Sequence, residues 1–94
     1  MNDILTPEEQ ETWDILRYTI ITDEEGSKHW YLNGKHHRED GPAIEYADGS
    51  REWYIDGKLH REDGPAIEYV GGHKQWWVNG KILTKEEFNE RMKK

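Results

Sequence analysis

Two clusters of histidine, arginine and acidic residues carry the side chains best suited to chemistry. Each cluster opens the stretch HREDGPAIEY, which occupies residues 37–46 and again residues 60–69. The clusters consist of His37, Arg38, Glu39 and Asp40 and of their copies His60, Arg61, Glu62 and Asp63. Imidazole beside carboxylate is typical of acid–base catalysis, and arginine beside histidine is typical of anion binding. The repeat is therefore either a duplicated site or a duplicated structural unit.

We interpret the repeated stretch as structural. The arginine would pair with Asp40 or Asp63, the histidine would hydrogen-bond to backbone, and the aspartate would support the turn before glycine. A chain of 94 residues rarely needs two equal catalytic sites, whereas a structural unit must recur. Cysteine is absent, and the only serines, Ser27 and Ser50, lie at turn positions. We therefore predict a chain that is not an enzyme and name no catalytic residue.

Metal binding by the histidines is disfavoured by distance. His37 and His60 are equivalent positions, so they should lie two strands apart, at about 10 Å. A shared Zn²⁺ needs each nitrogen at about 2.0–2.1 Å from the ion. His36 and His37 are neighbours in a strand and point to opposite faces. We predict no metal site and no cofactor.

A fixed step of 23 residues relates the tryptophans Trp30, Trp53 and Trp76. Two full units follow this step, GSKHWYLNGKHHREDGPAIEYAD at 26–48 and GSREWYIDGKLHREDGPAIEYVG at 49–71. A third unit begins as GHKQWWVNGK and then changes. A constant period of this length indicates a repeat architecture, in which neighbouring units bury each other's faces.

Each unit reads as two short strands. The first strands are KHWYL, REWYI and KQWWV, rich in aromatic and branched residues. They end in Asn-Gly at 33–34 and 79–80 and Asp-Gly at 56–57, which are strong tight-turn signals. PAIEY forms the return strand. The sequence therefore predicts a mainly β fold, an antiparallel meander of 23-residue β-hairpin repeats with about six strands.

The two ends differ from the repeats and predict helices. Thr6 and Glu9 form a capping-box pattern at one end, and Thr84 and Glu87 repeat it at the other. We expect a short N-terminal and a short C-terminal helix to cap the sheet edges. The whole chain, 1–94, forms a single domain: an acidic helix and first strand at 1–25, hairpin repeats at 26–83, and a C-terminal capping helix at 84–94.

Strand alternation assigns the aromatic residues to two faces. Trp30, Leu32 and their copies Trp53, Ile55, Trp76 and Val78 share the face that we expect to be the core. The other face either lies under the helices or presents an aromatic row for contact with a partner. The candidate partner-binding residues on it are Tyr31, Tyr54, Trp77, His29 and Glu52.

A column of cations offers an alternative ligand site. Lys28, Arg51 and Lys74 are equivalent and lie on the tryptophan side. Their stems could lie along tryptophan with the charges in water, or the charges could hold phosphate while aromatic rings stack on bases. The candidate anion-binding residues are Lys28, Arg51, Lys74, Arg38, Arg61, His37 and His60. Self-association could supply the closed pocket that one thin sheet lacks.

Charge and composition limit the partners. The formal net charge is −7, and the whole excess lies in residues 1–26, which hold eight acids and one base. This segment is a solvated helix face or a docking surface for a basic partner. Overall acidity argues against generic nucleic-acid binding. The sequence has no long apolar run, so we expect no membrane span or secretory signal. The absence of cysteine suits a reducing cytoplasm, which we predict as the location.

The repeat resembles known families. The 23-residue step with W-Y-x-N-G is similar to MORN-type β-hairpin repeats, although HREDGP stands where that motif has H-G-x-G. The pattern WYxNGxxHREDGPAxEYxDG, closing with NGKxLTxEEF, more specifically resembles small repeat proteins common in tailed bacteriophages and large DNA viruses. This resemblance covers residues 26–90. It implies a small binding or interaction module of viral origin.

The sequence leads to two candidate functions. The first is a non-enzymatic protein-binding module, encoded by a phage, that inhibits or redirects a host protein such as a defence component in the host cytoplasm. The task comes from the resemblance, and the binding mode comes from the aromatic row. The alternative is a sponge that sequesters a small anionic ligand such as a signalling nucleotide.

Overall fold

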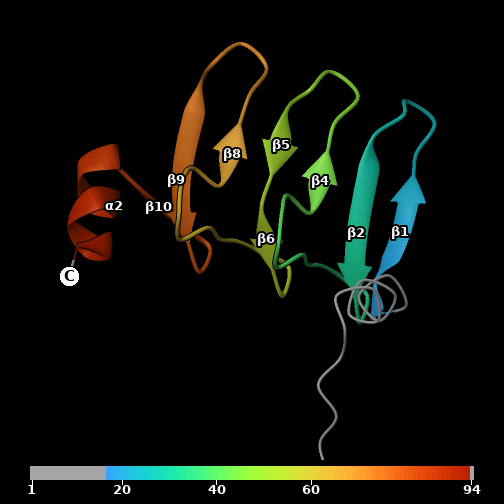
Figure 1. Ribbon diagram of the computed structural model, residues 1–94, viewed down its shortest axis with the longest axis horizontal. Coiled ribbons are helices and arrows are strands. Elements are labelled where there is room, and N and C mark those ends of the chain that lie inside the picture. The colour runs from blue at the N-terminus through green and yellow to red at the C-terminus, as the bar shows by residue number, and fades with distance from the viewer. Residues whose placement is uncertain (1–16, 94) are drawn as a thin grey trace, which may run out of the picture.

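Strands dominate residues 17–93, the part of the chain that the computed structural model describes (Figure 1). They are β1 (Thr19–Thr22), β2 (Lys28–Leu32), β3 (Lys35–His36), β4 (Ile44–Glu45), β5 (Arg51–Glu52), β6 (Tyr54–Ile55), β7 (Lys58–Leu59), β8 (Ile67–Glu68), β9 (Lys74–Val78) and β10 (Lys81–Leu83). The helix α2 (Lys85–Met92) follows β10. The predicted mainly β class is confirmed.

Neighbouring strands pair antiparallel throughout. The main sheet has the order β1-β2-β4-β5-β8-β9-β10, β3 pairs with β2, and β6 and β7 form a separate hairpin. This confirms the meander, but the predicted number of about six strands is wrong, because residues 17–93 form ten. Three of the additional strands, β3, β7 and β10, follow the tight turns, and a fourth arises because the expected strand REWYI divides into β5 and β6. There the chain folds back on the strand before the turn, as in the pair Tyr31↔His36.

The first strand of each unit changes its neighbour at the tryptophan. In unit 2 (residues 49–71), the Trp53 N–H donates to the Ala66 carbonyl at 2.8 Å. The Trp53 carbonyl accepts from the His60 N–H at 3.0 Å. One half of the strand thus belongs to the main sheet and the other half to the hairpin. The chain between these two neighbours leaves the sheet as loop 1 (residues 37–42) in unit 1 (residues 26–48) and as loop 2 (residues 60–65) in unit 2.

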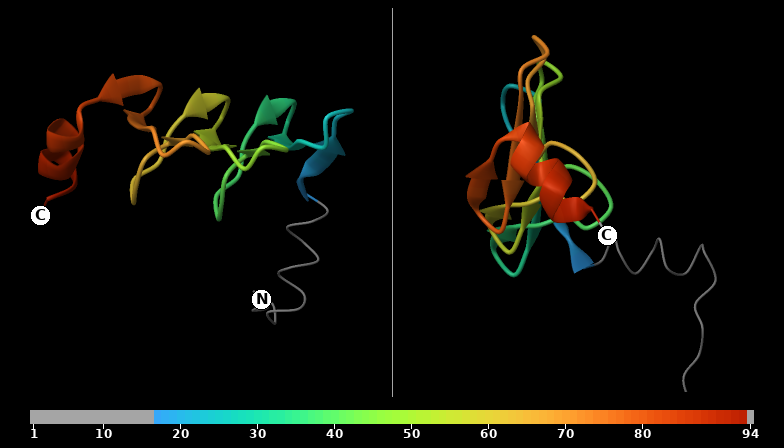
Figure 2. Two further views of the ribbon diagram at one scale, coloured as in Figure 1. Left: turned by 90° about the horizontal axis from the view of Figure 1, so that it is seen from above. Right: turned by 90° about the vertical axis from the view of Figure 1, so that its left-hand side faces the viewer.

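The tight turns have the conformation that their sequences predict. Asn33 and Gly34 have φ values of 53° and 79°, and the other two turns repeat this pattern. Positive φ at both central positions is the mark of a type I′ hairpin turn, which matches the twist of the flanking strands. The three turns therefore have the same shape, and they point in the same direction in successive units (Figure 2).

Helix α2 closes the C-terminal end of the row (Figure 2). The Thr84 side chain accepts from the Glu87 N–H at 3.0 Å, and the Glu87 carboxylate accepts from the Thr84 N–H at 2.8 Å. This capping box confirms the predicted C-terminal helix. Phe88 is buried, and α2 contacts β9 and β10. The N-terminal helix predicted from Thr6 falls on residues outside the described range.

The core is a thin line along the strands, in a body that measures 44 × 40 × 21 Å. The buried hydrophobic residues are Trp30, Ala43, Ile44, Ala66, Ile67, Val78 and Phe88. Of the predicted core column, Trp30 and Val78 are buried, whereas Trp53 and Trp76 are half-buried. Ile44 pairs with His29 and so lies on the opposite face. Both faces of the sheet therefore contribute to the core. In residues 17–93 no helix is long and apolar enough to cross a membrane.

Candidate functional site

Arg38 fastens loop 1 onto its own unit. Its guanidinium carbon lies 4.0 Å from the centre of the Trp30 ring, a cation–π contact. Nε donates to Asp40 Oδ1 at 3.1 Å, and Nη1 donates to the Pro42 carbonyl at 3.1 Å. Nη1 also donates to Glu45 Oε2 at 3.4 Å. One side chain thus joins the loop, the return strand and the tryptophan.

Arg61 repeats this arrangement in unit 2. Its guanidinium carbon lies 3.9 Å from the centre of the Trp53 ring. Nε donates to Asp63 Oδ1 at 2.8 Å, and Nη1 donates to the Pro65 carbonyl at 3.0 Å and to Glu68 Oε2 at 3.1 Å. The predicted arginine–aspartate pairing is confirmed, and each pair lies within one loop. These contacts support the structural interpretation of the repeated stretch.

Glycine in each loop makes room for the arginine. A Cβ added at Gly41 would lie 3.0 Å from Arg38 Cζ, and one added at Gly64 would lie 3.0 Å from Arg61 Cζ. Such distances are shorter than most contacts that a Cβ makes, so a side chain there would push the guanidinium away by a few tenths of an ångström. The sequence did not reveal this role, because the glycine could be read as a turn residue alone.

The loop histidines tie each unit to the next. His37 Nδ1 accepts from the Asp56 N–H at 2.9 Å, and His60 Nδ1 accepts from the Asn79 N–H at 3.0 Å. Nε2 is then the protonated nitrogen, and it bonds to Glu39 at 3.1 Å in loop 1 and to Glu62 at 3.2 Å in loop 2. The predicted hydrogen bond between histidine and backbone is confirmed, with the backbone N–H as donor. Within residues 17–93 no three acidic or histidine side chains form a metal-holding group.

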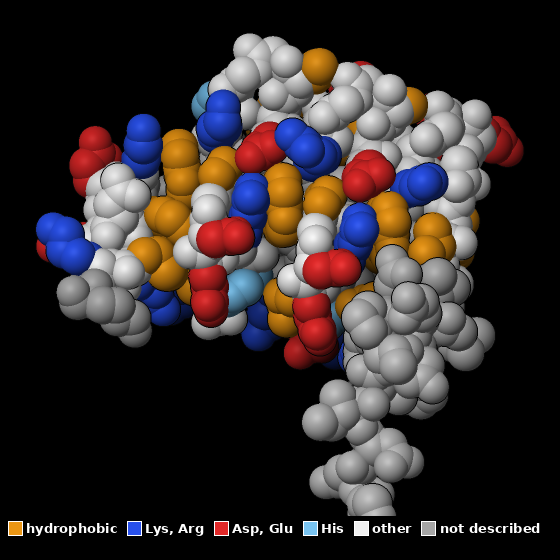
Figure 3. Space-filling model, in the orientation of Figure 1, with side chains coloured by type: hydrophobic (Ala, Val, Ile, Leu, Met, Phe, Trp, Pro, Cys, Tyr) orange, Lys and Arg blue, Asp and Glu red, His pale blue; other side chains and the backbone are white. Residues whose placement is uncertain are grey.

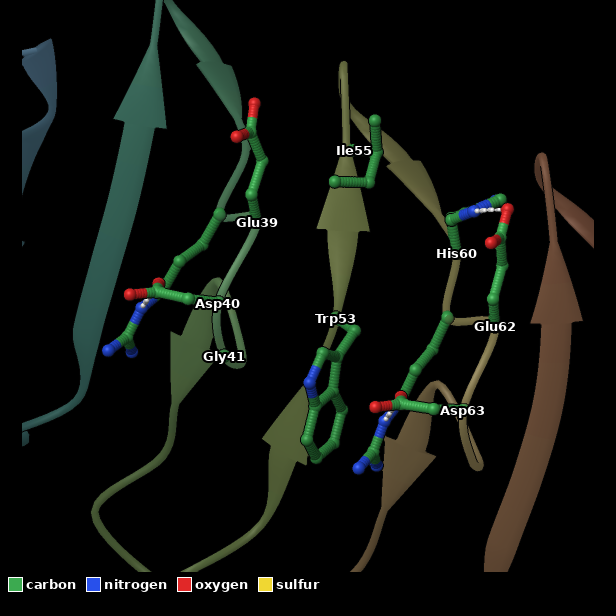
Figure 4. A pocket seen from close by; sticks show the side chains of 10 residues that line it. Glu39, Asp40, Gly41, Trp53, Ile55, His60, Glu62 and Asp63 are labelled. Atoms are coloured by element: carbon green, nitrogen blue, oxygen red, sulfur yellow. Dashed lines mark hydrogen bonds and ion pairs between the residues drawn. The ribbon is translucent and has the colours of Figure 1, made fainter. Parts of the chain in front are cut away.

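A groove of about 790 Å³ lies between loops 1 and 2. Trp53 and Ile55 line it from the strand between the loops, with Glu39 on one side and Glu62 on the other (Figure 4). Figure 3 shows hydrophobic side chains exposed between acidic and basic groups on this face. We had expected Trp53 and Ile55 in the core, but both are only half-buried. The sequence alone did not predict the groove.

The candidate partner-binding residues come together on the opposite face. Tyr31 lies with its ring centre 4.5 Å from that of His36, and Tyr54 lies 5.2 Å from the same imidazole. His36, which the sequence pattern did not indicate as a binding residue, thus joins two tyrosines of neighbouring units. The Tyr54 hydroxyl donates to Glu52 at 2.9 Å. Trp77 continues the row, and its Nε1–H donates to the Gln75 side chain at 3.0 Å.

Burial and the Glu52 carboxylate raise the pKa of two phenols on this face, Tyr46 and Tyr54. Burial, followed by the charge of Glu52 and a hydrogen bond with it, raises the pKa of Tyr46 to about 12. The same causes, burial first, also raise the pKa of Tyr54. A neutral phenol both donates and accepts a hydrogen bond. The row therefore presents amphipathic rings rather than charges.

Histidines extend the same face toward β1. His29 Nδ1 lies 3.2 Å from His36 Nε2, and His29 Nε2 lies 3.0 Å from Asp23 Oδ2. Burial lowers the pKa of His36, and the neighbouring His29 lowers it further. The hydrogen bond from His29 is the main cause that lowers the pKa of Asp23. His29 is therefore held between two partners rather than free to turn.

The cation column behaves differently from the loop arginines. Lys28 and Arg51 each lie 5.9 Å from the centre of the neighbouring tryptophan ring, farther than the loop arginines. Arg51 also pairs with Glu68 at 2.9 Å, so this carboxylate receives two arginines. Lys28 and Lys74 are exposed. The seven candidate anion-binding residues thus divide into exposed lysines and side chains already engaged with acids or backbone.

No protein-family model, curated protein or solved structure matches the chain. Kinship with MORN-like or phage repeat proteins therefore stays a prediction from the sequence pattern.

Proposed function

We propose that the chain is a non-enzymatic protein-binding module whose tyrosine face is the contact surface. One observation carries this proposal: large hydrophobic residues remain exposed along the whole face. Ile21 at one end is 48 % exposed and Ile82 at the other is 54 % exposed, with Tyr46 and Tyr69 at 36 % and 42 % between them. The registers Ile21↔His29 and Ile82↔Trp77 put both isoleucines on this side of the sheet. Exposed large hydrophobic residues spread along one face are typical of an interaction site.

The composition of the face supports a protein as the ligand. Tyrosine and tryptophan contribute much of the binding energy in protein interfaces, because their rings bury large areas with little loss of side-chain freedom. The rings of Tyr31 and Tyr54 are already held by His36. Binding to such pre-ordered rings costs less conformational entropy than binding to mobile ones.

Following the resemblance, we take the partner to be a host protein and the source to be a phage-like virus. The module would act by occupying a functional surface of that protein, for example a component of a defence system. This assignment of the partner derives from the repeat pattern and not from the geometry of the face.

The test uses two isoleucines of similar exposure on opposite faces. Tagged wild-type chain, Ile82→Ser and Ile20→Ser are used to capture proteins from a bacterial lysate, and bound proteins are quantified by mass spectrometry. Ile20 is 43 % exposed and pairs with Trp30, so it lies on the other side of the sheet. We expect Ile82→Ser to reduce capture of the specific partner by about tenfold, as loss of an interface anchor does, and Ile20→Ser to retain it. Equal capture by both variants would contradict the proposal.

The contacts of the loop arginines favour protein binding over the anion sponge. Nε and Nη1 of Arg38 and Arg61 already donate to carboxylates and carbonyls, so an incoming phosphate would have to compete with them. A thermal-shift screen with mono- and cyclic nucleotides separates the two functions. A nucleotide at 100 times its dissociation constant would add about 2.7 kcal/mol of stability. We expect no shift, and a clear shift would favour the sponge.

A further inference from the structure

The groove between loops 1 and 2 is acidic at its rims. The carboxylates of Glu39 and Asp40 are 59 % and 75 % exposed, and those of Glu62 and Asp63 are 72 % and 86 % exposed. The two guanidinium groups that line the groove are mostly covered, since the Arg38 and Arg61 side chains are 22 % and 21 % exposed. An approaching ligand therefore meets carboxylates first.

The floor of the groove is apolar. Trp53 and Ile55 lie on the strand between the two loops, and their side chains line the space that the four carboxylates surround (Figure 4). A ligand that fits needs an apolar stem for the floor and a positive charge for the rims. Lysine and arginine side chains combine these two parts. The molecule itself places an arginine against this tryptophan, with Arg61 at 3.9 Å from the ring centre.

The size of the groove indicates a segment of chain. A volume of about 790 Å³ lies in the range of pockets that hold ligands much larger than one side chain. A small anion is disfavoured by the rims, because bringing a like charge near exposed carboxylates costs free energy.

We propose that the groove between loops 1 and 2 binds a basic segment of a partner protein, with one arginine or lysine side chain lying over Trp53 and Ile55 between the carboxylates. This inference rests on the proposed function in taking the partner to be a protein. It adds a second contact surface, on the side of the sheet opposite the tyrosine face, and the chemical class of the segment that it takes.

The test uses short peptides and needs no identified partner. Isotope-labelled full chain is titrated with the pentapeptide acetyl-Gly-Leu-Arg-Leu-Gly-amide and followed by nuclear magnetic resonance. The same peptide with citrulline or with glutamate in place of arginine serves for comparison, since citrulline has the shape of arginine without its charge. We expect the arginine peptide to shift the Trp53 indole N–H and the Ile55 amide signals, with millimolar affinity. The citrulline peptide should bind about fivefold more weakly, and the glutamate peptide should give no shift.

A charge-matched pair of variants locates the effect. Glu39→Gln/Glu62→Gln removes two groove carboxylates but keeps an oxygen that can accept from each histidine. Glu24→Gln/Glu25→Gln removes two exposed carboxylates from the turn before β2 and so changes the net charge equally. We expect the groove variant to lose about two- to fivefold in affinity for the arginine peptide and the turn variant to stay within about twofold of wild type. Melting curves of both variants verify that they are folded.

Three results would overturn the groove proposal. They are equal binding of the arginine and citrulline peptides, equal affinity of the two double variants, and no shift of the Trp53 or Ile55 signals by the arginine peptide. These results leave the tyrosine face untouched, because Ile82→Ser and Ile20→Ser test that face separately. Loss of capture in Ile82→Ser together with an inert groove would therefore refute this inference and retain the proposed function.

Discussion

Replacing Arg61 by alanine removes the side chain that fastens loop 2, and we expect it to destabilise the fold. The change deletes the cation–π contact with Trp53, the hydrogen bond to the Pro65 carbonyl and the ion pair with Glu68. It also deletes the pair with Asp63, which is 86 % exposed and is expected to contribute little.

The magnitude follows from the burial of each contact. The cation–π contact of a mostly covered arginine is worth about 1 kcal/mol. The Pro65 carbonyl loses a charged donor, at a further cost of about 1 kcal/mol. Glu68 is 21 % exposed, so its pair contributes up to about 1 kcal/mol, although Arg51 remains to partner it. Together we expect a loss of about 2–3 kcal/mol.

Thermal unfolding followed by circular dichroism measures this loss. In a domain of this size 1 kcal/mol corresponds to about 4–8 °C, so Arg61→Ala should lower the melting temperature by about 10–20 °C. Lys81→Ala is the control, because Lys81 is an exposed residue of β10. Arg38→Ala should also destabilise, by an amount that differs with its neighbours. If both arginine variants melt within about 3 °C of the control, the structural interpretation is refuted and the repeated stretch becomes a duplicated site.

Three further predictions concern single positions. Gly64→Ala should cost about 1–2 kcal/mol in urea unfolding, because the new methyl would press on the guanidinium at 3.0 Å, whereas Gly71→Ala, with no atom within 4 Å, should cost less. His37→Ala should cost about 1–3 kcal/mol, because the Asp56 N–H loses its acceptor. The pKa of Tyr46 is raised to about 12, above the ordinary value of 10.0, so its contribution to stability is complete below about pH 10 and is lost as the pH rises toward 12. Urea midpoints measured between pH 9 and 12 test this, with Tyr46→Phe as the variant that should lose the Tyr46 share of this dependence and keep the share of Tyr54, whose pKa is also raised.

A specific result would contradict each of these three predictions. Equal stability of the two glycine variants would mean that loop 2 adjusts freely around the arginine. A His37→Ala variant as stable as an exposed His73→Ala variant would mean that the bond between units carries no net stability. Identical alkaline profiles for wild type and Tyr46→Phe would mean that other groups govern unfolding at high pH.

The repeats and their turns could be predicted because each depends on residues that are adjacent in the sequence. Asn33 and Gly34 lie next to each other and require positive φ together, and Thr84 with Glu87 defines a cap within one turn of helix. These are local signals, and the structure confirms them. The short strands such as β3 escaped prediction because two residues carry no periodicity, and their pairing depends on the turn before them.

The groove and the loop contacts depend on how distant residues meet. Arg38 comes eight positions after Trp30 in the sequence, yet it stacks on that ring because the loop doubles back. The sequence pattern favoured the Lys28 column as the cations over tryptophan, but these lie farther from the rings. Trp53 was also expected in the core, because strand alternation predicts which face a side chain lies on. Alternation does not predict which residues cover that face.

The contacts between successive units are alike and point in one direction. Loop 1 bonds to the turn of unit 2 through His37, and loop 2 bonds to the next turn through His60. An extra 23-residue unit inserted between two units could form the same hydrogen bonds with the unit on either side. Such a unit would lengthen the row of units by one constant step and add a further groove. Gene duplication alone could therefore change the length of the molecule and the number of peptide segments it binds, while the sequence of each unit stays the same.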